Sequence, residues 1–455
     1  MGNETQEVWE RLQTLVGDEM KKTGVPGVVV GILHDGEIRA AGFGVTNVDH
    51  PLDVTDQTLF QIGSITKTFT GTAIMRLVEM GKIDLDATVR TYVPDFKVGD
   101  ETASTRATIR HLLIHTGGWV GDFFRDTGPS ADALPKYVAE MADLEQLAPL
   151  GSVWSYNNAG FCLAGYVIER VTGQSYEAAL HDLVLEPLGL ENTFLNPADV
   201  MVHCFVAGHN VGEGGAQVAQ PWSLPRSAWP AGGIICTVHD LLRYAGFHMG
   251  DGTLEDGAQL LRLESLSQMQ TPHVTVWKDE QWGLTWSLDR LGQTRSIGHG
   301  GGTTGQVSLL TLVPVHKFAV AVFTNANSGG SVTSDVTKWA LKAYLGLEKP
   351  DPKPIQASEQ ELAAFVGRYE RPMVDLELGM LSGRLIGQMV YKGGFPSQDS
   401  PPPPPPPPAT LALCETDRLI VLDGMMKDGT VEVIRKEDGS IGWLRAGGRL
   451  LKRLA

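Results

Sequence analysis

Strand-like segments flank a mostly helical middle, and this order constrains the fold more than any other feature. "GVVVGILHDGEIRAAGFGV" places Asp35-Gly36 between two apolar runs, the strongest short-range signal for a β-hairpin. The runs "TRSIGH", "QVSLLTLV" and "FAVAVFTN" follow only from residue 294 onward. We therefore expect an α+β fold in which one antiparallel sheet is assembled from distant segments and flanked by helices, beside an all-helical region.

Helical periodicity fills the space between the strand-like runs. A helix is expected over 4–23, where Val8, Leu12, Leu15 and Val16 recur at helical spacing, and another over 64–80. The stretch from about 85 to 215 is mostly helical with loops, and its best-patterned helix covers 158–172. A capping box at Thr237 and Asp240 begins one more helix, and a last amphipathic helix ends near Leu347.

A domain boundary is predicted at "EKPDPKP", residues 348–354, where proline and charge interrupt every pattern. Short alternating runs follow, with Asp438-Gly439 as a second hairpin candidate. We expect a first domain over 1–347, a linker over 348–358 and a second domain over 359–455 that forms a small β-barrel or sandwich.

Eight consecutive prolines, 401–408, interrupt the second domain. Proline lacks the N–H that a sheet requires, so the run would extend as polyproline II over roughly 25 Å, at about 3.1 Å per residue. We expect a solvated loop between strands. A ligand for a proline-binding module is the open alternative.

Composition and charge exclude several classes of function. A formal charge of −16 makes nucleic acid an unlikely partner, and no stretch of 18 apolar residues predicts a membrane span. The four cysteines are scattered without metal-ligand spacing, and neither a metal nor a cofactor is expected. The acidic, amphipathic N-terminal segment does not resemble a secretory signal, which predicts a cytoplasmic protein, with a mature secreted form as the alternative.

One Ser-x-x-Lys pair, Ser64 and Lys67 in "QIGSITKTFTG", lies at the start of a predicted helix. Residues three apart on a helix share a face, so the two side chains can meet. Burial and the positive helix N-terminus would lower the lysine pKa, and a neutral lysine could accept the serine proton. Taken alone, the pair is equally compatible with a catalytic pair and with two polar residues on the first turn of an ordinary helix.

Two further pieces follow in order along the chain. "WSYNNAGF" supplies Tyr156 and Asn158, and "SIGHGGGTTG" supplies His299, Gly300 and Gly301. With these motifs and with "TIRHLLIHTGG", "EPLGLENT" and "PAGGIICTVHDLLRY", residues 10–346 resemble the serine β-lactamase and penicillin-binding-protein superfamily. The resemblance is to its branch of class C β-lactamases, D-aminopeptidases and family VIII esterases. The C-terminal piece, with "LAAFVGRYERP", is similar to the lipocalin-like barrel often attached to these hydrolases.

The resemblance implies roles for the motif residues. Ser64 would be the acylated nucleophile and Lys67 its proton partner, while Tyr156, held by Lys67, would be the general base for acylation and would activate water for deacylation. Asn158 would bind Lys67 or the substrate amide. His299, Gly300, Gly301 and Gly302 would bind substrate, with the backbone N–H groups of Ser64 and Gly302 forming an oxyanion hole.

The chain departs from the family at one informative point. Many penicillin-recognising enzymes have Lys-Thr-Gly where this chain has His299-Gly300-Gly301, so a permanent cation and a hydroxyl that would bind a substrate carboxylate are missing. With a reference pKa near 6.5, His299 would be mostly neutral at pH 7. This argues against tight capture of a β-lactam or a C-terminal D-alanine.

We therefore expect a serine hydrolase that cleaves small-molecule esters, amides or short peptides through an acyl-enzyme, with room for weak β-lactamase activity. Relatives with a barrel often assemble, so a homo-oligomer is also an expectation. A non-hydrolytic binder or sensor is the alternative from another class. A metallohydrolase is more distant: His111 and His115 are four apart, but no glutamate lies between them and the segment matches a structural turn of the family.

Overall fold

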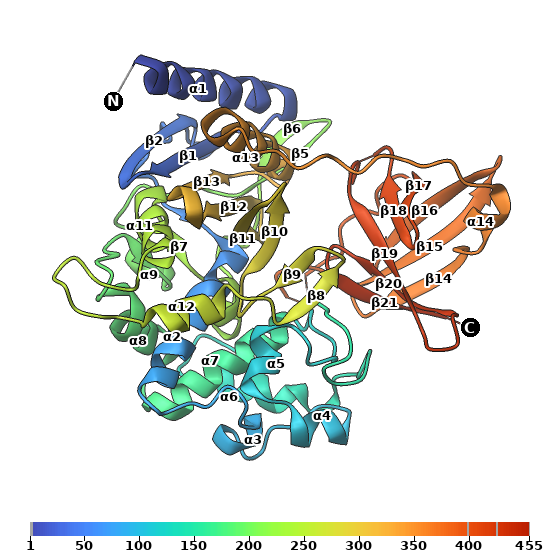
Figure 1. Cartoon of the computed structure of the whole chain (residues 1–455), viewed down its shortest axis with the longest axis horizontal. Helices are drawn as coiled ribbons and strands as arrows, with labels where there is room; N and C mark the ends of the chain where they lie inside the picture. The colour runs from blue at the N-terminus through green and yellow to red at the C-terminus, as the bar shows by residue number, and fades with distance from the viewer. Residues whose placement is uncertain (1–2, 398–399, 425, 455) are drawn as a thin grey trace.

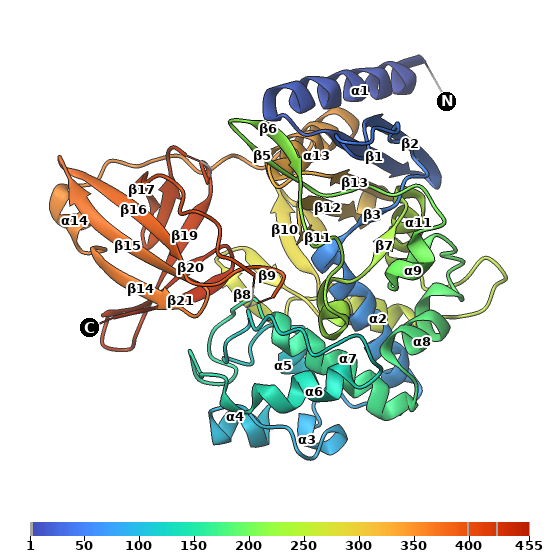
Figure 2. The same ribbon diagram turned by 180° about the vertical axis from the view of Figure 1, so that it is seen from behind.

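A computed structural model describes residues 3–397, 400–424 and 426–454 (Figure 1). The chain forms a mixed α/β portion and, beyond the extended segment after Leu345, a closed β-barrel (Figures 1 and 2). This confirms the predicted α+β fold and the C-terminal barrel. Dividing the chain at residues 347 and 359 stays our proposal.

The central sheet has eight antiparallel strands in the order β2-β1-β13-β12-β11-β10-β9-β8. Strands from the beginning and the end of the α/β portion pair directly, as Val28 with Thr324 and His34 with Phe318. The bounds are β1 Gly27–His34, β2 Glu37–Gly44, β8 Val274–Trp277, β9 Glu280–Trp282, β10 Ser287–Leu291, β11 Thr294–Thr303, β12 Gln306–Val313 and β13 Phe318–Thr324.

The predicted hairpin joins β1 to β2 through Asp35 and Gly36. Both residues have positive φ, 50° and 85°, the backbone shape of a two-residue turn whose twist matches that of the strands. Glycine adopts this conformation without a Cβ clash, and aspartate is among the side chains that tolerate it best.

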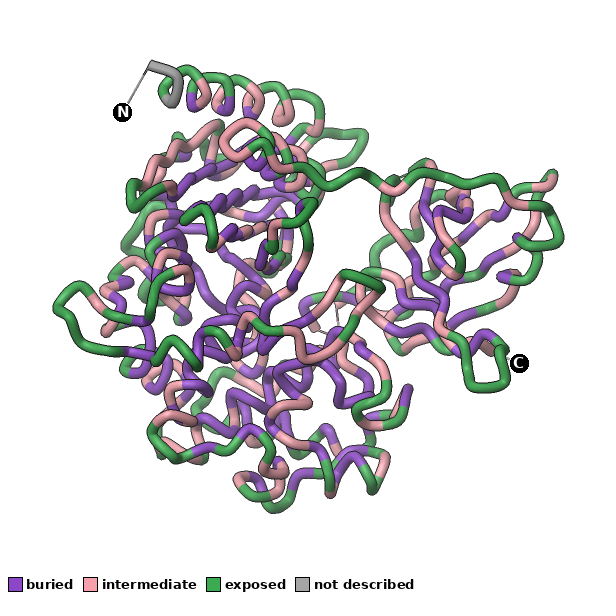
Figure 3. The backbone as a smooth tube through the Cα atoms, viewed as in Figure 1, coloured by how far each residue is buried: buried purple, intermediate pink, exposed green. Residues whose placement is uncertain are grey.

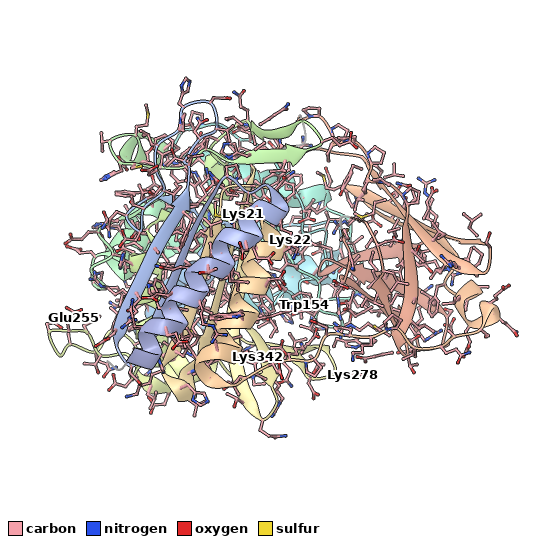
Figure 4. All side chains as sticks on the ribbon, turned by 90° about the horizontal axis from the view of Figure 1, so that it is seen from above. Lys21, Lys22, Trp154, Glu255, Lys278 and Lys342 are labelled. Carbon is pink, nitrogen blue, oxygen red and sulfur yellow. The ribbon has the colours of Figure 1, made fainter. Side chains whose placement is uncertain are left out.

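Helices cover both faces of this sheet. On one face α1 (Asn3–Thr23) lies beside α13 (Gly329–Leu345), as seen in Figure 4, where Lys21, Lys22 and Lys342 mark the two helices. Leu12, Val16 and Val336 of these helices pack on the apolar strand residues. On the other face lies α11 (Val238–Met249), whose N-cap Thr237 accepts a hydrogen bond from the Asp240 N–H.

Most of the other helices gather in one helical region, and the backbone at its centre is mostly buried (Figure 3). Helix α7 begins after Asn157, whose side chain accepts from the Gly160 N–H, and ends at Gly173 in a left-handed conformation, φ 72°. The principal helices are α2 Thr66–Glu79, α3 Val89–Tyr92, α4 Glu101–Arg106, α5 Ile109–Leu113, α6 Ala133–Glu140, α7 Asn158–Thr172, α8 Tyr176–Leu180, α9 Pro197–Val200, α10 Trp229–Gly232 and α12 Leu263–Met269. Short strands β3 Phe60–Gln61, β4 Thr193–Phe194 and β7 Ile235–Cys236 form one small sheet, and β5 His209–Gly212 pairs with β6 Gly215–Val218.

The barrel closes by pairing its first strand with its last, which leaves no free sheet edge. Helix α14 (Glu359–Ala363) precedes it and begins with a capping box between Ser358 and Glu361. The strands are β14 Gly367–Arg371, β15 Val374–Leu381, β16 Arg384–Tyr391, β17 Ala409–Glu415, β18 Arg418–Val421, β19 Thr430–Arg435, β20 Ile441–Ala446 and β21 Arg449–Arg453. The eight prolines lie between β16 and β17, and Asp438-Gly439 lies in the β19–β20 turn.

None of the helices within the described ranges combines the length and apolar character needed to cross a membrane.

Candidate active site

Ser64 lies in a short 3₁₀ turn, Gly63–Ile65, immediately before α2. Gly63 has φ 51°, and a Cβ added there would sit 2.5 Å from the backbone nitrogen of Gly302. Only glycine allows this approach, because any side chain would collide with the β11 backbone. The turn therefore holds Ser64 against β11, where the expected oxyanion donors, the N–H groups of Ser64 and Gly302, belong to adjacent segments.

Lys67 follows on the first turn of α2 and is fully buried. Its Nζ lies 2.9 Å from Oγ of Ser64 and donates to the carbonyl oxygen of Ala231 at 2.5 Å. Burial holds the pKa of Lys67 well below its usual value, and the nearby charge of Arg449 lowers it further. A lysine of this kind can be neutral, and its free lone pair can accept the serine proton.

Tyr156 lies in the segment that leads into α7, with Lys67 Nζ 4.9 Å from the centre of its ring. Burial raises the pKa of Tyr156, while Arg449 and the nearby Ser64 hydroxyl oppose the shift. The phenol is therefore neutral at neutral pH. A neutral phenol transfers a proton more readily than it acts as a base, so the resting state favours Lys67 as the acceptor of the serine proton.

Asn158, expected to bind Lys67 or the substrate amide, donates instead from Nδ2 to Oδ1 of Asp122 at 2.8 Å. It nevertheless lines the same cavity as Ser64, so substrate binding by Asn158 stays a prediction.

His299 lies on β11 and is buried. Its Nδ1 is 2.6 Å from the carbonyl oxygen of Gly300, so Nδ1 carries the proton and donates. Burial, with a smaller contribution from Lys67, lowers the pKa of His299 to about 3. His299 is therefore neutral at pH 7 and supplies no cation to the site.

The glycines after His299 allow β11 to approach the serine turn. A Cβ on Gly301 would sit 1.9 Å from the carbonyl oxygen of Ile62. Pairing of β10 with β11 stops at Gly298, so among the described residues the edge of β11 beyond it pairs with no strand on that side. An open strand edge of this kind can accept an extended substrate backbone, and substrate binding by Gly300, Gly301 and Gly302 stays a prediction.

His111 and His115 have structural contacts. The Thr108 N–H donates to Nδ1 of His111 in the cap of α5, and the Asn157 N–H donates to Nδ1 of His115 at 3.0 Å. Across the described ranges, one group of three potential metal ligands lies close together, His181, Asp182 and Glu186. All three are exposed, and none of them lines the Ser64 cavity.

The barrel contributes two site residues that we did not predict from the sequence. Arg371 and Arg449 each face Oδ2 of Asp122, at 3.5 Å and 3.3 Å. Burial alone would raise the pKa of Asp122, but Arg449, Arg371 and the Asn158 hydrogen bond bring it below its usual value. "RYERP", which contains Arg371, and the double glycine before Arg449 are the only sequence signals for them.

Ser64 borders a cavity of about 310 Å³, near the lower end of the range for small-molecule sites, whose described lining does not include Lys67, Tyr156 or His299. Both parts of the chain line it. The α/β portion supplies Ser64, Asp122, Phe123, Phe124, Arg125, Tyr137, Asn158, Cys162, Leu224, Ala228, Ala231, Gly232 and Gly302, and the barrel portion supplies Arg371, Met373, Val374, Tyr391, Gly393, Gly394, Phe395, Pro396, Pro403 and Arg449.

The fold and this serine-lysine-tyrosine site define the class of serine β-lactamases and penicillin-binding proteins. The family model described as Beta-lactamase matches residues 12–344, and the chain belongs to that family. Penicillin-binding protein 4 of Amycolatopsis lactamdurans is 33% identical over 357 residues, which cover 76% of this chain and 93% of that protein. The chain is thus of the serine hydrolase type.

Several solved structures resemble almost the whole chain. SurE with D-Leu has a TM-score of 0.75 at 24% identity, covering 99% of this chain and 100% of that one. The octameric penicillin-binding protein homologue from Pyrococcus abyssi has a TM-score of 0.68 at 25% identity, covering 97% and 99%. The likeness to SurE is one of fold and extends through the barrel.

Proposed function

We propose that this protein cleaves esters or amide bonds of small peptides through an acyl-enzyme on Ser64. The observation that carries the proposal is the contact between Nζ of Lys67 and Oγ of Ser64, 2.9 Å long, at a lysine that burial makes a proton acceptor. Burial lowers the pKa of Lys67, which favours the neutral amine beside the serine hydroxyl.

Acylation would begin when Ser64 Oγ attacks the substrate carbonyl carbon and its proton passes to Lys67 Nζ. The tetrahedral oxyanion would be stabilised by the N–H groups of Ser64 and Gly302, worth about 3–4 kcal/mol per donor in related chemistry. The proton would return to the leaving group through the neutral Tyr156 hydroxyl. Water then attacks the acyl-enzyme by the reverse route, releasing the acid and restoring Ser64.

The charges around the cavity bear on the substrate. His299 supplies no cation, which on sequence grounds argued against a carboxylate. Arg371 and Arg449 together carry two positive charges against the single negative charge of Asp122, so the cavity has an excess of positive charge. We propose that substrates carrying a carboxylate are accepted through these arginines.

The fold neighbour whose structure is described as SurE with D-Leu supports including D-aminoacyl compounds among the substrates to be tested. The octameric homologue likewise supports testing for a homo-oligomer, which stays a prediction.

The test compares the parent with Ser64→Ala and Lys67→Met on p-nitrophenyl butyrate and on D- and L-alanine p-nitroanilide. We expect Ser64→Ala to be inactive and Lys67→Met to lose about 10²–10⁴-fold in kcat. A fluorophosphonate should add one adduct mass at Ser64 of the parent. Ser152→Ala, at an exposed serine, is the matched control and should retain activity. Turnover that survives Ser64→Ala would overturn the proposal.

The alternative of a binder or sensor is decided by the same experiment. Stoichiometric labelling of Ser64 by fluorescent penicillin without turnover of any ester or amide would favour the binder. Multiple turnovers per Ser64 would exclude it.

A further inference from the structure

Half of the barrel residues that line the Ser64 cavity lie in one connection, residues 392–408, which joins β16 to β17. We name its described parts, 392–397 and 400–408, the β16–β17 loop. Phe395, Pro396 and Pro403 of this loop line the cavity together with Ser64. The proline-rich segment therefore borders the reaction centre as well as solvent.

An aromatic pair joins the loop to the α/β portion. The ring of Phe395 meets the ring of Phe124 edge to face, with centroids 5.1 Å apart and planes at 86°. Phe124 lies two residues beyond Asp122, in the segment that borders Ser64. Phe395 is 39% exposed, so part of its surface remains open to an apolar group. Covering this surface with an apolar group of a ligand would remove it from water, which is favourable.

The loop is built to hold its shape. A Cβ on Gly394 would lie 2.1 Å from the carbonyl oxygen of Ser400, so the two limbs of the loop pack closely at a glycine. The Lys392 N–H donates to the Met373 carbonyl at 2.9 Å, and Gln388 Nε2 donates to the Pro406 carbonyl at 2.9 Å. Proline has a fixed φ and no N–H donor, so a proline wall is stiff and leaves no donor unpaired against an apolar ligand.

We infer that Phe124, Phe395 and Pro403 form an apolar subsite that selects acyl donors with a bulky aromatic or long aliphatic side chain. The inference deepens the proposed function and rests on acylation of Ser64. The acyl group stays on Ser64 through both chemical steps while the leaving group departs, so a contact to the acyl side acts in acylation and deacylation alike. An apolar contact of this kind discriminates by about 10–200-fold.

The test measures kcat/KM of the full chain for p-nitrophenyl acetate and p-nitrophenyl 3-phenylpropionate, which share a leaving group and differ only in the acyl side. The quantity of interest is the selectivity ratio, bulky over acetyl. We expect Phe395→Ala and Phe124→Ala each to lower this ratio by about tenfold or more. Leu381→Ala is the matched control, because Leu381 is an exposed apolar residue of the same barrel that does not line the cavity. It should leave the ratio unchanged.

Replacing the eight prolines by an alternating glycine–serine segment of equal length tests whether the stiffness of the proline run contributes to the subsite. We expect a higher KM for the bulky ester with little change in kcat. For the Phe124→Ala and Phe395→Ala variants, an unchanged selectivity ratio would overturn the inference. If both esters lost activity equally, the two side chains would have only a structural role. Failure of the proposed function is distinguishable, because the parent would then hydrolyse neither ester through Ser64.

Discussion

The backbone N–H of Tyr156 donates a 2.8 Å hydrogen bond to the carbonyl oxygen of Gly448, so the segment carrying the candidate proton relay is tied to the barrel. The Leu450 N–H reaches Oγ of Ser155 at 3.3 Å, and Nε1 of Trp443 donates to the Leu147 carbonyl at 2.9 Å. Figure 4 labels Trp154, which lies in this docking segment. The barrel thus belongs to the structure of the site.

The β20–β21 turn should control catalysis through Tyr156. Gly448 has φ 79°, and its Cβ would lie 3.1 Å from Cη2 of Trp154. Gly448→Ala should cost about 1–2 kcal/mol of stability from the left-handed backbone and lower kcat by about tenfold through a displaced Tyr156. Gly439→Ala is the matched control, since Gly439 has φ 81° in another barrel turn with open space around its Cβ. Equal kcat values for the two variants, measured on a neutral ester, would contradict the prediction.

Arg449 should set the acid limb of the pH–rate profile. Activity requires neutral Lys67, so kcat/KM falls as the pH drops through the lysine pKa. The positive charge of Arg449 lowers the pKa of Lys67, so Arg449→Leu should raise that pKa and move the acid limb to higher pH. Lys452→Leu, three residues along the same strand and exposed, should leave the profile in place. A profile for Arg449→Leu that moves to lower pH or stays fixed would count against Lys67 as the base.

Arg371 should contribute to carboxylate preference. It is mostly buried beside Asp122, which retains Arg449 as a second partner when Arg371 is removed. Arg371→Met should reduce kcat/KM for a substrate with a free carboxylate by about tenfold or more relative to its carboxamide, the size expected for a charge-assisted hydrogen bond. The measurement is the ratio of the two substrates in each enzyme. An unchanged ratio would remove Arg371 from substrate recognition.

Stability should fall in mild acid because of buried neutral histidines. Burial lowers the pKa of His248 and of His299 to about 3, against a usual value of 6.5. Below about pH 6.5 these histidines become protonated in the unfolded chain but stay neutral in the folded one. The free energy of unfolding therefore decreases by roughly 1.4 kcal/mol per pH unit for each histidine. Urea unfolding at several pH values between 7 and 5 measures this slope.

His248→Gln should reduce the pH dependence of the free energy of unfolding by the contribution of one histidine. His50→Gln, at an exposed histidine, should not change it. The same slope in both variants would contradict the assignment.

Local sequence determined much of the fold. The Asp35-Gly36 turn, the capped helix over 158–172 and the alternating strands are specified by neighbours in the chain, because turn geometry and caps depend on a few adjacent residues. The spacing of Ser64 and Lys67 likewise places both on one face of α2, and the structure brings them together. Tyr156 and His299 were identified by motif order and the family resemblance.

Only the tertiary structure decided how the site is completed. Nothing in the sequence places Asp122, Arg371 and Arg449 side by side, and they meet because the barrel docks against the α/β portion. Asn158 donates to Asp122, and the two barrel arginines bring permanent positive charge to a site where His299 is neutral. The proline run is extended by its own covalent geometry, but its place beside Ser64 depends on the barrel. Backbone preferences act over a few residues, whereas desolvation and charge pairing depend on groups that only folding brings within a few ångströms.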